Sequence, residues 1–184
     1  MIKNYTEIEG WCADEITSIY DKAISRAKGG EIFVELGCYK GRSTCYMVDS
    51  IIKSGKNIKF YVVDNFSTLG DVKAQFLENL GEERIKKIIF LEQDSHLSAS
   101  NFLNESVDYL FIDTDHKFEI LDKELSAWIP KVKIGGIISG HDFNEGGVKQ
   151  AVEKNHTKSI FVNISTLQKG NNNNWRYYSW WFEK

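Results

Sequence analysis

Five short runs of branched and aromatic residues recur along this chain, and longer segments with helical spacing separate them. The runs cover residues 32–36, 59–63, 88–91, 107–112 and 134–139. Each is nearly continuous in apolar residues, as parallel strands are when helices cover both faces of their sheet. Because strand and helix patterns alternate over most of the length, the sequence predicts a doubly wound α/β fold with a mostly parallel sheet.

The segments between these runs carry apolar residues at steps of three and four, which is typical of amphipathic helices. The first helix is expected from Ile8 to Ala27, ahead of the glycine pair Gly29 and Gly30. Further helices are expected over residues 43–53, 71–80, 95–103, 118–128 and 147–154. The only proline, Pro130, falls where the helix at 118–128 should end.

The last part of the chain departs from this alternation. Residues 159–164 and 175–182 both have the composition of strands, with a turn-rich stretch and four asparagines but no helix between them. Two strands joined in this way must be antiparallel, because a parallel pair needs a crossover of about a dozen residues or more. The second strand has aromatic residues on both faces, so we expect it inside the sheet rather than at an edge.

The 184 residues are expected to form one domain, with a helical segment at 1–30, a core at 31–146 and a closing helix and hairpin at 147–184. Three cysteines without a C-x-x-C pair indicate free thiols in a reducing compartment. With neither a signal-peptide pattern nor an apolar run of membrane-spanning length, we expect a cytoplasmic protein without a membrane partner. A net charge of −3 with scattered basic residues argues against nucleic acid and favours a small-molecule partner.

A glycine-containing loop at residues 35–43, with the sequence ELGCYKGRS, joins the first predicted strand to the next helix. Glycines at such a turn let the backbone approach a ligand and aim helix N–H groups at a carboxylate or phosphate. The spacing differs from the G-x-G-x-x-G dinucleotide fingerprint and from a P-loop, so a ligand with adenosine but no pyrophosphate fits better. A tight turn without a ligand is the alternative interpretation.

Short polar residues follow the second and third predicted strands: Asp64 and Asn65 after the second, and Gln93, Asp94 and Ser95 after the third. An acid after the second strand can accept hydrogen bonds from both ribose hydroxyls, and the later group can meet an adenine edge. Open α/β sheets bind ligands at the carboxyl ends of their strands, so this regular placement favours a nucleoside site. Capping of the next helix is the alternative for each residue taken alone.

The fourth and fifth predicted strands both end in carboxylates and imidazoles. Asp113 and His116 follow the fourth strand, and His141 and Asp142 follow the fifth. Carboxylate oxygens suit Mg²⁺ or Mn²⁺, and each imidazole shifts the preference toward Mn²⁺, Fe²⁺ or Zn²⁺. A bound cation would lower the pKa of a coordinated substrate hydroxyl. In the alternative, Asp113 caps the next helix, and His141 and Asp142 are a simple loop pair.

The loop at 35–43 resembles the E-L-G-x-Y-x-G-x-S loop of catechol O-methyltransferase-like class I enzymes that depend on S-adenosylmethionine (SAM). Residues 111–116 and 135–142 resemble the F-I-D-x-D-H and G-G-x-I-x-x-H-D motifs of a small bacterial and viral branch of that superfamily. The resemblance covers residues 31–146. It implies an enzyme that uses SAM, built on a Rossmann-like seven-stranded sheet of order 3-2-1-4-5-7-6 with a reversed last strand.

The resemblance implies roles for the glycine loop. Glu35, Gly37 and Gly41 would shape the pocket for the methionine end of SAM, and the Ser43 hydroxyl would bind its carboxylate. Tyr39, in the same loop, belongs to the predicted cofactor-binding set because it should border the site.

The nucleoside end of SAM is assigned in the same way. Asp64 would take the ribose hydroxyls, with Asn65 beside it. Ser95, together with Gln93 or Asp94, would meet the adenine. These residues follow the second and third strands, where the polar side chains already favour a nucleoside.

Metal-dependent members of the family hold a cation with an Asp after the fourth strand and two adjacent residues after the fifth. Those positions are Asp113, His141 and Asp142 here. Asp113 is also expected to border the cofactor and to be a catalytic residue together with His116. The usual adjacent pair is Asp-Asn or Asp-Asp, so His141 departs from the pattern. Where the catechol enzymes carry a lysine base, this chain has His116, which titrates near neutrality and can serve as the catalytic base.

The expected function is SAM-dependent methylation of a small-molecule hydroxyl on a phenol, diol or sugar, with or without Mg²⁺ or Mn²⁺. The hydroxyl would lose its proton to His116 or to a metal and attack the sulfonium methyl in line. A nicotinamide-dependent oxidoreductase is the runner-up, and a hydroxylase and a non-catalytic cofactor-binding member are further alternatives. A homodimer is compatible with the sequence; Trp11 or Trp128 could face it, although core packing is more usual for such side chains.

Overall fold

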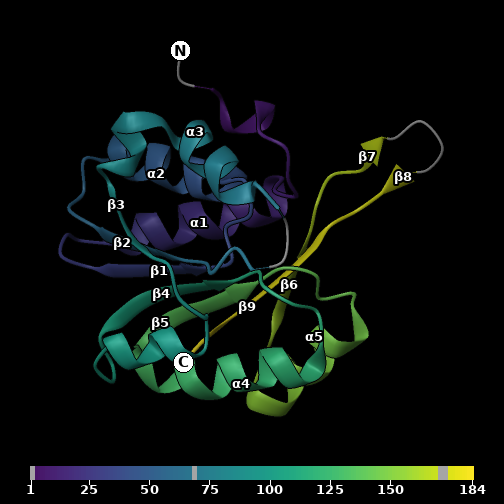
Figure 1. Ribbon diagram of the computed structural model, residues 1–184. Coiled ribbons are helices and arrows are strands. Elements are labelled where there is room, and N and C mark those ends of the chain that lie inside the picture. Colours follow the sequence, from purple (N-terminus) through teal and green to yellow (C-terminus); the bar gives the residue numbers. More distant parts are fainter. Residues whose placement is uncertain (1–2, 68–69, 170–173) are drawn as a thin grey trace.

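The computed structural model describes residues 3–67, 70–169 and 174–184, and a seven-stranded sheet forms its centre. The strand order is β3-β2-β1-β4-β5-β9-β6 (Figure 1), which confirms the predicted order apart from numbering. The strands are β1 (Ile32–Leu36), β2 (Lys59–Val63), β3 (Ile88–Leu91), β4 (Val107–Ile112), β5 (Val132–Gly140), β6 (Phe161–Ile164) and β9 (Tyr178–Glu183). Within this sheet, β9 alone runs against the others.

Helices cover both faces of the sheet (Figure 1). One face carries α1 (Asp14–Arg26), α2 (Arg42–Ser54) and α3 (Val72–Ile85), and the other carries α4 (Phe118–Trp128) and α5 (Gly146–Asn155). Neighbouring residues of one strand point into different cores: Phe33 packs with the first group of helices and Val34 with the second. The near-continuous apolar runs therefore follow from burial on two sides.

The register of the strands determines where a site can form. Leu36 of β1 pairs with Val63 of β2 and Ile112 of β4. Val63 in turn pairs with Leu91 of β3, and Ile112 pairs with Gly140 of β5. Each of these residues is the last of its strand, so the five following segments leave the sheet at one edge. The polar residues predicted from the sequence converge there.

The C-terminal strand β9 lies between β5 and β6, which confirms the predicted position inside the sheet. The expectation of a continuous strand over 175–182 is wrong, because Trp175 belongs to a separate hairpin of β7 (Gln168–Lys169) and β8 (Asn174–Trp175). Between β8 and β9, the Ser165 N–H donates to the Tyr177 carbonyl at 2.9 Å, but the Ser165 hydroxyl accepts the Tyr177 N–H at 2.8 Å, so a side chain replaces one bond of the backbone ladder. The hairpin extends away from the sheet (Figure 1), and residues 171–173 of the asparagine run lie outside the described residues.

Helix α1 begins at Asp14 rather than at Ile8 as expected. Gly10 has a φ of +147°, and a short 3₁₀ helix, η1 (Tyr5–Glu7), comes before it. Ile8 and Cys12 are nevertheless buried, which is why their spacing resembles a helical face. The spacing of the apolar residues in this segment therefore indicates which residues are buried, but not that the segment is helical.

The expected helix at 95–103 is also wrong, since residues Leu97–Asn101 form the 3₁₀ helix η2. The hydroxyls of Ser98 and Ser100 donate to carbonyls three residues earlier, which suits this tighter winding. Helix α4 ends at Trp128 as expected, and Pro130 lies in η3 (Ile129–Lys131). Among the described residues, no helix combines the length and apolar character that crossing a membrane requires.

Candidate active site

Two cavities open at the edge where the five strand ends meet. The first, of about 380 Å³, extends over the ends of β2 and β3. The second, of about 540 Å³, extends over the end of β5 and toward the N-terminal segment. Gly37, Tyr39, Asp113 and Thr114 line both cavities. Because the shared wall lies at the ends of β1 and β4, one elongated ligand can occupy both spaces.

The first cavity contains every residue that the sequence assigned to the nucleoside. These are Asp64, Asn65, Gln93, Asp94 and Ser95. Apolar side chains line the same space, namely Val63, Phe66, Val72 and Ile120. Apolar walls with a few polar groups are typical of small-molecule and cofactor sites, and this combination suits a flat base and a ribose.

Asp64 also orders the glycine loop. Its Oδ2 accepts the Cys38 N–H at 2.8 Å and its Oδ1 accepts the Phe66 N–H at 2.8 Å. Carboxylate oxygens have further lone pairs, so Asp64 can hold the loop and accept a ribose hydroxyl together. The loop requires glycine at position 37, because Gly37 has a φ of +80° and a Cβ there would collide with the Asp113 carbonyl oxygen.

Two residues assigned to the methionine end, Glu35 and Gly41, do not line either cavity. Glu35 is buried, and it accepts hydrogen bonds from the hydroxyls of Ser43 at 2.5 Å, Thr44 at 2.7 Å and Tyr20 at 3.2 Å. Burial raises the pKa of Glu35 to about 7, although the three hydroxyl donors oppose this shift. Glu35 therefore supports the loop from behind, while Ser43 lines the second cavity.

The second cavity is bordered by the N-terminal segment that carries Gly10 and Trp11. Arg42 donates to the Cys12 carbonyl at 3.1 Å and to the Ile8 carbonyl at 3.0 Å, which fixes this segment over the start of α2. Trp11 lines the cavity and is 58% exposed, and its ring centroid lies 5.6 Å from that of Tyr39. The core packing expected for Trp11 is therefore wrong, because the segment that carries it is extended and not helical.

The carboxylates and imidazoles predicted after β4 and β5 come together on the wall of the second cavity. Asp113, His141 and Asp142 each place a ligand atom within 4.8 Å of the others. His141 Nδ1 lies 3.1 Å from Asp142 Oδ2 and 3.9 Å from Asp113 Oδ1. The Nε2 atom of His116 lies 2.9 Å from the same Asp142 oxygen. One carboxylate oxygen thus contacts both rings.

The electrostatics of this cluster centre on His141. Burial acts to lower the pKa of His141, but the neighbouring carboxylates of Asp142, Glu15 and Asp113 raise it to about 10. Burial raises the pKa of Asp113 to about 6, with His141 opposing the shift. For Asp142, the effect of burial is outweighed by His141, so its pKa is lowered. At neutral pH and without a cation, a positive ring lies among carboxylates.

Sequence reasoning also missed Glu124 of α4. This carboxylate is buried and accepts hydrogen bonds from Ser95 and, at 2.7 Å, from Thr114, two residues that line the first cavity. Burial raises the pKa of Glu124 to about 6, against the effect of these donors. A signal for it existed: Glu124 lies three positions after Leu121 and one before Leu125, on the apolar face of the predicted helix.

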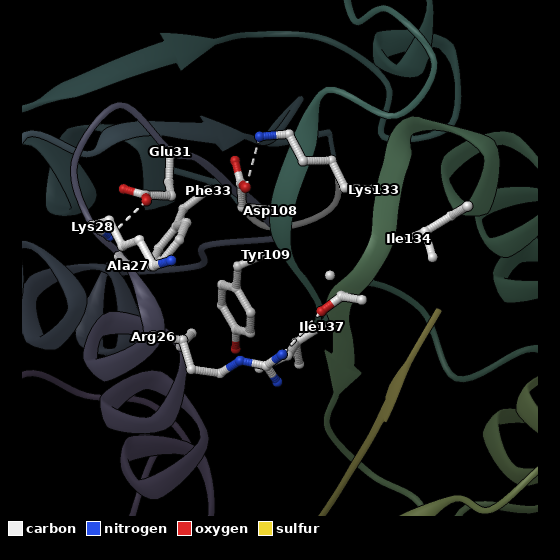
Figure 2. Close-up of a pocket in the computed structure, with 13 residues that line it drawn as sticks. Arg26, Ala27, Lys28, Glu31, Phe33, Asp108, Tyr109, Lys133, Ile134 and Ile137 are labelled. Carbon is white, nitrogen blue, oxygen red and sulfur yellow. Dashed lines mark hydrogen bonds and ion pairs between the residues drawn. The ribbon is translucent and has the colours of Figure 1, made fainter.

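A third cavity, of about 270 Å³, lies at the opposite edge of the sheet, near the first residues of β1 and β4 (Figure 2). Three of its charged side chains, Lys133, Asp108 and Arg26, are paired. Lys133 lies 2.7 Å from Asp108, and Arg26 lies 2.6 Å from Glu183 and donates to the Gly135 carbonyl at 3.2 Å. With these charges satisfied and no strand-end residue of the first two cavities in its wall, this space is separate from the candidate active site.

The family described as "Methyltransferase domain" matches residues 34–143, more than half of the 184 residues. The chain therefore belongs to this family, and it is a class I SAM-dependent methyltransferase. The match includes the glycine loop and the carboxylate–imidazole cluster, and it favours a methyltransferase over the nicotinamide-dependent oxidoreductase. No curated protein sequence matches the chain.

Solved structures share the fold. A precorrin-6y C5,15-methyltransferase from Geobacter metallireducens has a TM-score of 0.68 at 10% identity, and the alignment covers 100% of this chain and 97% of that protein's chain. An rRNA methylase from Streptococcus thermophilus has a TM-score of 0.65 at 13% identity, with coverage of 95% and 99%. A TDP-rhamnose 3'-O-methyltransferase of calicheamicin biosynthesis has a TM-score of 0.56 at 14% identity, with coverage of 89% and 75%. These likenesses concern the fold, so the acceptor must be argued from the site.

Proposed function

We propose that this methyltransferase transfers a methyl group from SAM to a hydroxyl of a small molecule, with His116 as general base. The supporting observation is the pair formed by His116 Nε2 and Asp142 Oδ2, 2.9 Å apart on the wall of the second cavity. A carboxylate that accepts one ring N–H of histidine leaves the other nitrogen free to take a proton. The pair lies beside the wall that the two cavities share, where a transferable methyl group and a hydroxyl can meet.

The residues of the two cavities fit SAM, which supplies an electrophilic methyl group when bound. Asp64 would accept the ribose hydroxyls, and Ser95 would meet the adenine. Gly37 lies in the wall that the two cavities share. Arg42 and Ser43 line the second cavity. Because the Ser43 hydroxyl already donates its proton to Glu35, Arg42 is the residue that would face the carboxylate of the methionine end.

The chain's own contribution is to position the acceptor and to remove its proton. His116 is 55% exposed, so its ring is accessible to a hydroxyl that enters from solvent. Asp142 holds the ring and stabilises the positive charge that it gains. A positioned base of this kind contributes about 10²- to 10⁴-fold in rate, and correct orientation of the reactants contributes up to about 7–11 kcal/mol.

Asp113, His141 and Asp142 also fit a divalent cation, which forms a second part of the proposal. Two carboxylates and a ring nitrogen lie within 4.8 Å of one another, so one ion can contact all three. A cation held there would lower the pKa of a coordinated hydroxyl. Loss of turnover on chelation, with recovery in Mg²⁺ or Mn²⁺, would support this part, and turnover that is indifferent to chelator would reject it.

The second cavity supports a ring-shaped acceptor. Trp11, Tyr39 and Tyr177 line it together with His116, and aromatic walls around one polar corner suit a phenol, a cyclic diol or a sugar. A nucleic-acid acceptor is disfavoured because the chain has one proline and lacks the N/D-P-P-Y/F element of many nucleic-acid methyltransferases. A homodimer that covers the exposed Trp11 stays part of the proposal, and sedimentation velocity measures it directly.

Titration calorimetry with SAM, S-adenosylhomocysteine and NAD tests the cofactor. We expect the first two to bind and NAD to give no heat. A panel of phenols, cyclic diols and glycosides is then screened for S-adenosylhomocysteine production, with His116→Gln as the matched background control. Binding of NAD but not SAM would contradict the proposal, and SAM binding without transfer to any acceptor would favour the non-catalytic alternative.

A further inference from the structure

Glu15 and His141 form a buried pair that the proposed methyl transfer does not use. Glu15 lies in the first turn of α1, and His141 follows β5. The Glu15 side chain is 0% exposed and that of His141 is 3% exposed, with Oε1 and Nε2 3.5 Å apart. Among the described residues, neither Glu15 Oε2 nor His141 Nε2 has a hydrogen-bond partner. Each residue of the pair thus has one buried polar atom without a hydrogen-bond partner in the described part of the chain.

Burying a carboxylate away from water is costly unless a donor or a positive charge accompanies it. Glu15 Oε1 also accepts the Ala13 N–H at 3.4 Å, a long contact that leaves most of its acceptor capacity unused. His141 is therefore the group that compensates Glu15. The ring of Tyr177, with its centroid 5.6 Å from that of His141, packs beside it and limits its rotation.

The His141 ring is oriented so that its two nitrogens face different partners. Nε2 points to α1 and Glu15, whereas Nδ1 points into the cluster, 3.1 Å from Asp142 and 3.9 Å from Asp113. Histidines that bind metals usually donate their second N–H to a carboxylate, which fixes the tautomer and the direction of the ring. Glu15 occupies the position of that carboxylate.

We propose that Glu15 is a positioning residue that accepts the Nε2–H of His141 and so directs the Nδ1 lone pair at a cation shared with Asp113 and Asp142. The inference rests on the cation site of the proposed function and deepens it. An imidazole ligand beside two carboxylates favours Mn²⁺ or Zn²⁺ over Mg²⁺, which prefers oxygen ligands alone. The two histidines then have separate tasks: His141 holds the cation, and the exposed His116 takes the proton.

Calorimetric titration with Mn²⁺, Zn²⁺ and Mg²⁺ in the absence of SAM tests this proposal. The wild type is expected to bind Mn²⁺ at least about tenfold more tightly than Mg²⁺. Glu15→Ala should weaken Mn²⁺ binding about 10- to 100-fold, while Glu15→Gln, whose amide oxygen can still accept the N–H, should lose less. Asp21→Asn is the matched control, since Asp21 is an exposed acid on the same helix, and it should bind Mn²⁺ like the wild type.

Nitrogen NMR of the ¹⁵N-histidine-labelled, Zn²⁺-loaded protein gives a readout that does not depend on activity. We expect His141 to carry its proton on Nε2 and its metal on Nδ1, with His141→Asn used to assign the signals. Metal on Nε2, equal Mn²⁺ affinity in wild type and Glu15→Ala, equal affinity for Mg²⁺ and Mn²⁺, or no cation binding would each overturn the proposal. If Glu15→Ala does not fold, the wild-type ring signals and its Mn²⁺ to Mg²⁺ ratio decide.

The same samples separate this inference from the proposed function. SAM titrations measure the cofactor site, which Glu15 does not line, so Glu15→Ala should bind SAM like the wild type. Failure of SAM binding in the wild type would contradict methyl transfer and leave the cation result standing. Failure of cation binding with intact SAM binding would contradict the cation site and the role of Glu15, and would leave methyl transfer with His116 as the base standing.

Discussion

The Nε2 atom of His116 and the Oδ2 atom of Asp142 lie 2.9 Å apart although they follow different strands. β4 and β5 pair in register, with Ile112 opposite Gly140, so the segments after them leave the sheet together. Asp142 also has a φ of +56°, a left-handed conformation that Asp tolerates better than most residues. A strained backbone at this position is consistent with a functional constraint on the carboxylate.

Replacing the proposed base should slow methyl transfer without affecting the cofactor. His116→Gln is expected to reduce the rate of S-adenosylhomocysteine formation about 10²- to 10⁴-fold, because the acceptor hydroxyl loses its proton acceptor. SAM affinity by calorimetry should stay unchanged, since His116 does not line the nucleoside cavity. Lys117→Gln, at the adjacent exposed position, is the matched control. A rate in His116→Gln equal to that of this control would remove His116 from the mechanism.

Asp64 should be the most sensitive position for cofactor binding. Asp64→Asn removes the charge that accepts the ribose hydroxyls and weakens the bond that orders Cys38. Hydrogen bonds to charged groups are worth about 1.5–3 kcal/mol, so SAM affinity should fall about 10- to 100-fold. Asp71→Asn, an exposed acid before α3, controls for net charge. Equal heats of SAM binding in both variants and the wild type would contradict the ribose assignment.

Gly37 and Gly55 have similar backbone conformations, so alanine substitutions at these two positions distinguish the cost of backbone strain from the cost of a steric clash. Gly37 has a φ of +80° and Gly55 a φ of +68°, so alanine at either position costs about 1 kcal/mol or more through backbone strain. A Cβ at Gly55 meets nothing within 4 Å, whereas one at Gly37 collides with the Asp113 carbonyl oxygen. Gly37→Ala should therefore lose about 1–3 kcal/mol more in chemical denaturation than Gly55→Ala. Similar losses of unfolding free energy in the two variants would show that the close contact between Gly37 and Asp113 does not contribute to stability.

Glu35 should make stability depend on pH. Its pKa is raised to about 7 in the folded protein from 4.5, so the folded state binds the proton more tightly than the unfolded chain does. The stability that this group contributes is present below pH 4.5 and is lost as the pH rises through 7. Relative to Glu35→Gln, the wild type should lose up to about 3 kcal/mol of unfolding free energy between acidic and alkaline pH.

Denaturation curves of wild type and Glu35→Gln at several pH values measure this difference. Asp113 and Glu124, whose pKa values are also raised, are present in both proteins, so their contributions cancel. Parallel stability curves for the two proteins across this range would contradict the raised pKa of Glu35.

The sheet could be predicted closely because its signals are local. The first four strands match the predicted ranges at every residue, since an apolar run flanked by polar residues is itself the requirement for a strand buried on two faces. Asp64, Asp113 and Asp142 could be assigned to one edge for a related reason. Each follows a strand of a parallel sheet, and connectivity alone directs such positions to the same side.

The predicted start of the first helix was wrong because the residues before Asp14 are buried at helical spacing without having a helical backbone. Ile8 and Cys12 have helical spacing and are buried, yet Gly10 between them turns the chain away from a helix. Trp11, for which core packing is the more usual expectation, instead lines the second cavity. Hydrophobic period reports which residues face the core, but it does not distinguish a helix from an extended segment lying on the same surface.

Local pattern and chain order sufficed for the fold, the edge that holds the site and the residues that end each strand, because these depend on the period of buried residues and on the handedness of crossovers. Only the folded molecule shows Glu15 beneath His141, Glu124 behind Ser95, and Trp11 and Tyr177 around one cavity. These partners lie far apart along the chain. Packing between elements brings them together, and no periodicity within one element records which distant side chain it will meet.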